Sequence, residues 1–533
     1  MEDRSMIRPV TSADRAVLRE LLAEFYDTDA VLHPLPASYH DAALDELFRS
    51  DSLQRACLLE QDGETAGYGL LSLKYSHEAG GLELWVEELY VRPAFRGRGL
   101  GHEFFAWLRG LSAAEHIRRI RLETEPENER AAALYARMGF FAAGLLPDVP
   151  GGSNMIYLDN AATTRPCAEA VAAVNDALTA RWGNPSAVHR LGIEAARLLR
   201  TARQDVAEAM GAETERVFFT SGGTEADNWA IFSAAERLGK RGRHIVTTAV
   251  EHHAVLHPMQ KLEQQGFSVT YLQPDAEGRV SLEALQAALR PDTILVSIMM
   301  VNNESGAVMP IERMARLTHR VCPNALFHTD AVQGFFKVPF RARTLGADLI
   351  SVSAHKVHGI KGAGALYIRP GLPLPPFVLG GGQESGLRSG TEGLPAIAAF
   401  AAACRAALPK RTESIARQRR LLAQAQELLR AIDGVQLLGA QEAPHILNLA
   451  VPGVRSQGLI NALQERDIYV SAGSACSKGH RSHVLEAMGV DAAWIDGSVR
   501  VSLSDETTED DIRALAEALP AVLTELRGGG RRA

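Results

Sequence analysis

Residues 293–333 read TILVSIMMVNNESGAVMPIERMARLTHRVCPNALFHTDAVQ, and this stretch decides the fold class of the larger part of the chain. Two apolar, β-rich runs, TILVSIMMV and LFHTD, flank the helix-like segment IERMARLTHR. A strand that is apolar throughout is typical of a parallel sheet with helices on both faces, because both sides of such a strand are buried. The stretch therefore predicts an α/β domain.

The same alternation of strand and helix continues on both sides of this stretch. The runs VFFTS (217–221), HIVTTAVEH (244–252) and SVTYLQ (268–273) precede it, and ISVSAHK (350–356) and GALYIRP (364–370) follow it. In such sheets, ligands bind at the carboxyl ends of the strands. The polar residues that gather at these ends are Ser221 to Thr224, His252, Asn303, Asp330, Gln333 and Ser353 to Lys356.

The chain is too long for one hydrophobic core. Its 533 residues predict at least two domains. The run LLPDVPGGSN (145–154) concentrates Pro, Gly, Asp and Ser, which is typical of a linker. We therefore expect an N-terminal domain over residues 1–148, a linker over 149–154 and a larger C-terminal unit over 155–533.

Charge and composition exclude several classes of protein. The net charge of −8 is small for this length, and basic residues form no long run, so nucleic-acid binding is not expected. The N-terminus begins with charged residues, and no stretch of about 18 apolar residues occurs, so we expect a cytoplasmic protein that does not bind membranes. The five cysteines are scattered and form no C-x-x-C pair, so neither a disulfide framework nor a metal site is predicted.

Three positions of the C-terminal unit suggest cofactor chemistry. Gly222-Gly223-Thr224 joins a strand to a helix, where backbone N–H groups can hold a phosphate; plain turn chemistry is the alternative. Asp330 ends a β-rich run, where a buried carboxylate needs a cationic partner such as a pyridinium nitrogen, unless it caps a helix. Lys356 ends another such run, so it is a candidate Schiff-base lysine; a lysine whose ammonium reaches solvent is the alternative.

Ten stretches of the C-terminal unit resemble the NifS/IscS group of cysteine desulfurases, which belong to the class-V aminotransferase family. The resemblance covers Met155 to about Leu526, and the stretches come in the order found in the family. They are YLDNAATT, GNPSAVH, FFTSGGTEADN, EHHAVL, VNNESG, HTDAVQ, SAHKVHG, GGGQESGLRSGT, SAGSACSKG and SVRVSLS.

The resemblance implies a fold-type I enzyme that binds pyridoxal 5'-phosphate. A large doubly wound α/β domain over about 169–410 would hold the cofactor. A smaller α+β domain would comprise about 411–533 together with 155–168. The family forms homodimers with shared active sites, so a homodimer is implied here, with Thr391 reaching the phosphate of the neighbouring subunit.

The resemblance also implies a role for each site residue. Those that would bind the cofactor phosphate are Gly223, Thr224, Ser353 and His355. Lys356 would hold the cofactor as a Schiff base, and Asp330 would keep the pyridine nitrogen protonated. Gln333 and Asn303 would bind near the ring hydroxyl, and His252 would stack on the ring and handle a proton. Arg500 would bind the substrate carboxylate, with Asn303 beside it.

Cys476 lies in SAGSACSKG, a small-residue stretch typical of a loop, and Lys478, His480 and Arg481 follow it. Cationic neighbours favour the reactive thiolate. The other four cysteines, Cys57, Cys167, Cys322 and Cys404, lie in helical or apolar stretches, where a small buried side chain is expected.

By resemblance, Cys476 takes the sulfur of L-cysteine as a persulfide, alanine leaves, and a protein acceptor receives the sulfur. Iron–sulfur cluster assembly, tRNA thiolation and thiamine synthesis remain open. The loop after Cys476 is slightly shorter than in the housekeeping desulfurases, and Gln383 stands where those enzymes carry His. A selenocysteine lyase or another class-V lyase, which would not need Cys476, is the alternative.

The N-terminal domain has a different plan, in which a hairpin around Asp62-Gly63 precedes the long strand LELWVEELYV. The strand leads into the loop that contains Arg96, Gly97, Gly99 and Gly101, and then into a helix. With the later strand RIRLET and the helix AAALYARMGF, this order resembles the GNAT acetyltransferases, a mixed α/β fold.

In that family the glycine loop binds the pyrophosphate of acetyl-CoA. By resemblance Tyr135 would protonate the leaving thiolate, and Glu88 could deprotonate an amine. A core tyrosine and a solvent-facing strand carboxylate are the alternatives. The domain could instead be a non-catalytic module that positions a sulfur acceptor, or Met155 could start translation and leave it out.

Overall fold

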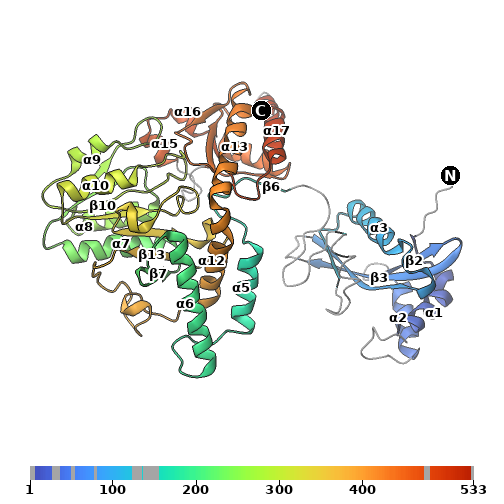
Figure 1. The fold of residues 1–533 in the computed structure, drawn as a ribbon. Coiled ribbons are helices and arrows are strands. Elements are labelled where there is room, and N and C mark those ends of the chain that lie inside the picture. The colour runs from blue at the N-terminus through green and yellow to red at the C-terminus, as the bar shows by residue number, and fades with distance from the viewer. Residues whose placement is uncertain are drawn as a thin grey trace. The chain divides into compact units, whose positions relative to one another are not determined.

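The computed structural model describes residues 7–26, 37–49, 54–76, 81–122, 135, 138, 155–472 and 481–529. The chain forms two compact units, Met1–Asn154 and Met155–Ala533 (Figure 1). Among the helices of the described ranges, none is both long and apolar enough to cross a bilayer.

The first unit is built on one five-stranded sheet in the order β1-β2-β3-β4-β5, antiparallel except for the parallel pair β4 and β5. Its strands are β1 (Ile7–Pro9), β2 (Gln54–Gln61), β3 (Glu64–Ser76), β4 (Gly81–Val91) and β5 (Arg119–Leu122). The predicted hairpin joins β2 to β3 through Asp62 and Gly63, whose φ angles of 55° and 85° suit a tight turn.

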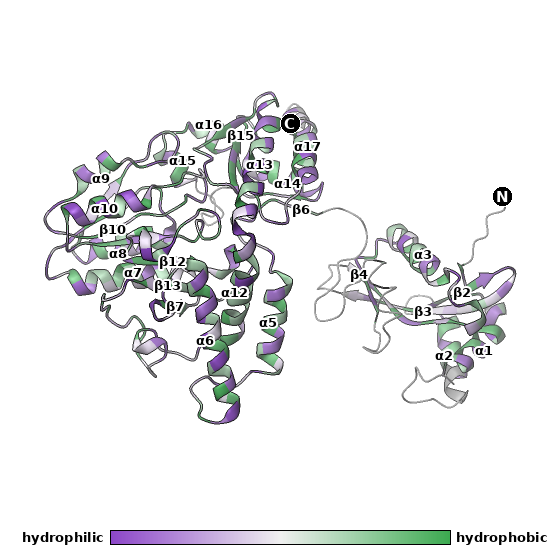
Figure 2. Cartoon of the chain, in the orientation of Figure 1, coloured by the Kyte–Doolittle hydropathy of each residue, from purple (hydrophilic) through white to green (hydrophobic). Residues whose placement is uncertain are grey.

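Three helices of the first unit are α1 (Arg15–Tyr26), α2 (Ala37–Arg49) and α3 (Leu100–Ala114). The apolar spacing along α1 predicts one buried face, and Leu18, Leu21 and Leu22 are buried. Hydrophobic and hydrophilic residues alternate along α1 and α3, as expected for helices that cover a sheet (Figure 2).

The larger sheet of the second unit has seven strands in the order β7-β13-β12-β11-β10-β8-β9. They are β7 (Val217–Thr220), β8 (His244–Thr248), β9 (Ser268–Leu272), β10 (Thr293–Ser297), β11 (Leu326–Asp330), β12 (Leu349–Ser353) and β13 (Gly364–Ile368). Only β13 runs antiparallel to its neighbours. The predicted mostly parallel sheet is confirmed.

Helices cover both faces of this sheet, because successive strand residues belong to opposite cores. Leu295 and Leu326 pack in the core that contains residues of α7 and α8, whereas Val296 and Phe327 pack in the core that contains residues of α6, α10 and α12. The helices of this part are α5 (Ala168–Thr179), α6 (Arg190–Met210), α7 (Gly223–Leu238), α8 (His253–Gln264), α9 (Leu282–Ala288), α10 (Ile311–Val321), α11 (Ala342–Leu345) and α12 (Leu394–Ala407).

A second core lies in the C-terminal part of this unit, under an antiparallel sheet in the order β14-β15-β17. The elements of this C-terminal part are α13 (Arg411–Arg430), β14 (Gln436–Leu438), β15 (Ile446–Ala450), α14 (Ser456–Gln464), α15 (His483–Ala487), α16 (Ala492–Ile495), β17 (Ser498–Ser502) and α17 (Glu509–Gly529). Strand β6 (Ile156–Tyr157) pairs in parallel with β16 (Ile468–Tyr469). This pairing brings the residues that follow Tyr157 beside the C-terminal part of the chain.

Several strands end before the runs that predict them. Strand β8 ends at Thr248 rather than at His252, β10 ends at Ser297 rather than at Val301, and β12 ends at Ser353. Strand β13 begins at Gly364, directly opposite Ser353, so the ladder has no further partner there, and residues Ala354–Lys356 form a 3₁₀ turn. Lys356 therefore follows the strand rather than closing it.

Candidate active site

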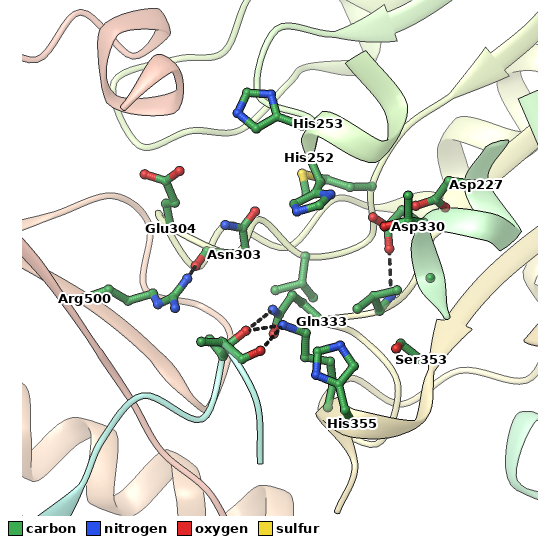
Figure 3. Close-up of a pocket in the computed structure, with 18 of the residues that line it drawn as sticks. Asp227, His252, His253, Asn303, Glu304, Asp330, Gln333, Ser353, His355 and Arg500 are labelled. Carbon is green, nitrogen blue, oxygen red and sulfur yellow. Dashed lines mark hydrogen bonds between the residues drawn. The ribbon is translucent and has the colours of Figure 1, made fainter. Parts of the chain in front are cut away.

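A cavity of about 320 Å³ is lined by residues that follow strands β7, β8, β10, β11 and β12 (Figure 3). These strands run parallel, so the cavity lies where the sequence predicts a ligand site, at their carboxyl ends. The residues expected at the site that line it are Gly223, Thr224, His252, Asn303, Asp330, Gln333, Ser353, His355, Lys356 and Arg500. Thr391 is exposed and does not line it.

One end of the cavity is suited to an anion. Helix α7 begins at Gly223, and the first N–H groups of a helix have no partner within it. A Cβ atom on Gly223 would lie 2.7 Å from Cγ2 of Val332, so a side chain does not fit there. The Ser353 hydroxyl is buried and, within the described residues, has no hydrogen-bond partner. Helix terminus and hydroxyl together offer unused donors.

Asp330 presents a carboxylate to the cavity. It is 6% exposed and accepts a hydrogen bond of 2.8 Å from the Val332 N–H. Burial raises the pKa of Asp330 to about 7, and the nearby Asp227 contributes to this shift. A cation in the cavity would stabilise the ionised form of Asp330.

His252 is held in one orientation at the start of helix α8. Its Nδ1 accepts a hydrogen bond of 3.1 Å from the Ala254 N–H. Burial and, to a smaller extent, the charge of Lys356 lower the pKa of His252 to about 4. The ring is therefore neutral near pH 7, and its single proton is on Nε2, because Nδ1 is an acceptor.

Lys356 and Gln333 both contact the segment that follows β6. The Lys356 Nζ donates to the carbonyl oxygens of Ala161 and Ala162 at 2.6 and 2.7 Å. The Gln333 Nε2 donates to the Ala161 oxygen at 2.8 Å, and its Oε1 lies 3.2 Å from Nε2 of His445. His355 lies on the same turn as Lys356, with its Nδ1 3.3 Å from the Thr163 hydroxyl.

Arg500 lies on β17 and is 3% exposed. Its Nη1 donates to the Asn303 carbonyl at 3.0 Å, and its Nη2 donates to Asp159 Oδ1 at 2.9 Å and to Ser471 Oγ at 3.0 Å. Its buried Nε has no acceptor among the residues that the structure describes. A donor therefore remains for a carboxylate ligand.

Four further ionisable residues also line the cavity, although the sequence does not single them out. They are Asp227, His253, Glu304 and His483. Asp227 lies four residues after Gly223 on α7, so helical spacing was a signal that could have indicated it. Glu304 accepts a hydrogen bond of 2.5 Å from the Ser482 hydroxyl. His483 comes from a distant helix, and the sequence offers no signal for it. No group of His, Cys, Asp and Glu in the described ranges is placed to hold a metal ion.

Cys476, Lys478 and His480 lie outside the described residues. Arg481 forms a two-pronged pair with Asp496, with distances of 2.7 and 2.8 Å, so its charge is already matched. Three of the other cysteines, Cys57, Cys322 and Cys404, are buried as predicted.

Cys167 is half-buried at the N-cap of α5, so the expectation of a buried side chain is wrong for it. Its side chain packs against the small cluster of Ala170, Ala399 and Ala403, which covers it only in part. Burial raises the thiol pKa of all four of these cysteines, so none of them favours a thiolate.

The glycine loop of the first unit ends at Gly99, the N-cap of α3, with φ of 94°. Gly97 also has a positive φ, of 80°, and the Arg96 Nε donates to the Val91 carbonyl at 2.8 Å. Gly101 lies in the first turn of α3. The loop thus ends on a helix N-terminus, where the sequence predicts a pyrophosphate site.

Glu88 lies at a register shift between β3 and β4 and is half-buried. Its carboxylate accepts hydrogen bonds from the hydroxyls of Tyr26 at 2.8 Å and Tyr68 at 2.5 Å, so it does not simply face solvent.

Tyr135 packs edge-on against Phe105, with ring centroids 5.6 Å apart. Burial raises the pKa of Tyr135, which keeps its hydroxyl protonated.

Residues 156–515 match the family described as Aminotransferase class-V. The chain belongs to this family. Residues 16–140 match the family described as Acetyltransferase (GNAT), so the first unit is a GNAT domain. Both resemblances seen in the sequence are confirmed.

Among known relatives, the protein named Cysteine desulfurase IscS from Methanosarcina thermophila is 40% identical over 376 residues, which cover 70% of this chain and 93% of that protein. A solved structure titled NIFS-LIKE PROTEIN is 38% identical, with a TM-score of 0.66, and the match covers 70% of this chain and all of that one. A structure titled SspA in complex with cysteine is 33% identical, with a TM-score of 0.58, covering 66% and 99%.

The buried carboxyl of Asp227 predicts a pH-dependent stability. Burial raises the pKa of Asp227 from 3.8 to about 7, so the folded protein holds this proton more tightly than the unfolded chain does. The stability gained in this way is fully present below pH 3.8 and is lost as the pH rises through about 7. Asparagine stays neutral. In the cofactor-free protein, the advantage of Asp227→Asn over the wild type in free energy of unfolding should therefore grow between pH 5 and pH 7.5, by on the order of a few kcal/mol.

Urea denaturation at the two pH values measures this difference. The exposed Asp491 provides a control, since Asp491→Asn should differ equally from the wild type at both. If the free energy of unfolding of Asp227→Asn differed from that of the wild type by the same amount at both pH values, the raised pKa of Asp227 would be contradicted.

Proposed function

We propose that residues 155–533 form a cysteine desulfurase that depends on pyridoxal 5'-phosphate, converts L-cysteine to L-alanine and leaves the sulfur on Cys476. The observation that carries the proposal is the convergence of Lys356, Asp330, His252 and Arg500 on one cavity. The names of the relatives, including cysteine desulfurases and a protein solved with cysteine, support the same activity.

The cavity fits pyridoxal phosphate at each of its functional groups. The start of α7 and the unpaired Ser353 hydroxyl offer donors to the phosphate, with Thr224 and His355 beside them. Asp330 would hold a protonated ring nitrogen, and Lys356 would hold the aldehyde carbon. When bound, the cofactor supplies an electron-withdrawing ring that stabilises negative charge on the substrate carbon next to the amine.

The polar residues around the ring set its orientation in this proposal. Gln333 is fixed by the Ala161 carbonyl and by His445, so its amide is held in place at the cavity wall. Asn303 lines the cavity, and its backbone carbonyl accepts a hydrogen bond from Arg500. Both amides would bind near the ring hydroxyl, and His252 would lie over the ring face.

The protein's own groups then carry out the remaining chemistry. Arg500 binds the substrate carboxylate through its unused Nε, while Asp159 and Ser471 hold the guanidinium in place. Lys356 takes the proton from Cα, and the Nε2–H of His252 donates a hydrogen bond to the reacting groups. The thiolate of Cys476 attacks the substrate sulfur, and the persulfide passes to a protein acceptor for iron–sulfur cluster assembly or for thiolation of tRNA or a cofactor.

Replacing Cys476 with Ser separates this mechanism from its alternative. We expect alanine formation from cysteine to fall by at least about 100-fold, because the nucleophile is lost, while cysteine binding persists. The matched control is Cys167→Ser, since this thiol is half-buried and its pKa is raised, so it should keep full activity. Alanine and sulfide release that survives in Cys476→Ser would instead favour a selenocysteine lyase or another class-V lyase.

The second unit also carries a surface suited to a second copy of the chain. Four exposed apolar side chains lie on and between α5 and α6, which are Leu178, Trp182, Val188 and Ile193, exposed by 58, 64, 93 and 45%. Such a concentration of exposed apolar side chains in one segment is typical of an interface. We propose that it forms the homodimer contact and that Thr391, which is exposed outside the cavity, serves the partner's site.

Light scattering tests the dimer. The wild type should show twice the chain mass of 57.6 kDa, and Trp182→Glu should shift the mass toward that of one chain, because a charge replaces an apolar contact. Tyr75→Glu, a change at another exposed aromatic, should leave the dimer intact. A wild-type monomer would contradict the proposal.

For the GNAT domain we propose acetyl transfer from acetyl-CoA to an amine. Residues Arg96 to Gly101 would bind the pyrophosphate, Glu88 would take the amine proton, and Tyr135 would protonate the leaving thiolate. The support is the helix N-terminus at the glycine loop, the carboxylate held by two tyrosines and the protonated Tyr135.

Tyr135→Phe is expected to bind acetyl-CoA as the wild type does in calorimetry but to release CoA at least about tenfold more slowly in a screen of amines. Tyr75→Phe is the surface control. Absence of acetyl-CoA binding by the wild type would contradict acetyl transfer and favour the non-catalytic binding module.

A further inference from the structure

Four histidines line the active-site cavity, and three of them, His252, His253 and His483, form a chain of rings that His257 extends. His252 and His253 are consecutive residues where α8 begins, and His483 is the first residue of α15. The ring centroid of His253 lies 6.3 Å from that of His252, and 4.9 Å from those of both His257 and His483. Figure 3 shows His252 and His253 at the cavity, and His257, which contacts His253, is exposed.

The hydrogen bonds assign the protons on two of these rings. The Nδ1 of His252 accepts the Ala254 N–H, so its proton is on Nε2, and this ring has no free lone pair to accept a proton. The Nε2 of His483 lies 3.0 Å from the Glu251 carbonyl oxygen, so Nε2 is a donor.

His253 is different, because its Nδ1 is buried and finds no hydrogen-bond partner in the part of the chain that the structure describes. Burial lowers the pKa of His253, with smaller contributions from His483 and His257. The ring is thus neutral near pH 7. His253 lies between the exposed His257 and His483, and its unpartnered Nδ1 offers a lone pair if the proton of the neutral ring is on Nε2.

The proposed reaction requires both a proton acceptor and a proton donor. The Cys476 thiolate forms the S–S bond with its own electron pair, the C–S bond of the substrate breaks, and that pair stays on the carbon. The carbon then takes up a proton to become the methyl group of alanine, while the substrate S–H loses one because the persulfide leaves as an anion. One proton therefore moves from sulfur to carbon.

We propose that His253, paired with His483, is the second acid–base residue of this site, which takes the proton from the thiol of bound cysteine so that it can be returned to the carbon. His253 then returns the proton to the cavity, or exchanges it with solvent through His257. This inference rests on the proposed desulfurase function.

Kinetics of His253→Asn and His253→Gln test the inference, because an amide hydrogen-bonds but does not carry a proton. We expect kcat for alanine formation to fall by at least about tenfold. The KM for cysteine and the absorbance of the bound cofactor should stay unchanged, and added imidazole should restore part of the rate in His253→Ala. His257→Asn should cost less, and the exposed His102→Asn should cost nothing.

Histidine NMR of the cofactor-free protein gives a readout that does not depend on activity. The signal that disappears in His253→Asn should titrate at a higher pH in His483→Asn, because one source of its lowered pKa is removed. Full activity of both amide variants in an active wild-type background would overturn the inference, as would an unaltered titration. An inactive wild type would instead contradict the proposed function itself.

Discussion

The buried carboxylate of Asp330 is the constraint on which the cavity depends. It lies at the end of β11, and burial together with Asp227 makes its ionised form costly. Of the cations that line the cavity, Arg500 is already paired with Asp159, and the Lys356 Nζ is bound by two carbonyls. A protonated ring nitrogen would supply the missing charge, so the same carboxylate that weakens the empty cavity would stabilise the occupied one.

The parallel sheet explains why so much of the site is visible in the sequence. The side chains along the middle of these strands pack in the two cores, so the residues of β7, β8, β10, β11 and β12 that reach the cavity lie at the strand ends or directly after them. This rule placed Gly223, His252, Asp330 and Lys356 correctly. It did not place the strand ends themselves, because the ladder partner decides where a strand stops, as Gly364 does for β12.

The rest of the site depends on contacts between distant segments, which no local pattern encodes. Strand β6 pairs with β16 and thereby brings the Ala161 and Ala162 carbonyls to Lys356. His483 lies at the start of α15, and its hydrogen bond to the Glu251 carbonyl holds it at the cavity. In the GNAT domain, Glu88 was visible in the sequence, but the tyrosines that hold it were not, because they lie on α1 and β3.

The most direct test of the central claim is to find the lysine that holds the cofactor. Borohydride treatment of the protein with pyridoxal phosphate fixes the cofactor to that lysine, and mass spectrometry of the peptides then locates it. The structure predicts a phosphopyridoxyl group on Lys356 in the wild type and its loss in Asp330→Ala, which lacks the partner of the ring nitrogen. Labelling of the buried Lys337 instead, or of no lysine, would contradict the assignment of this cavity.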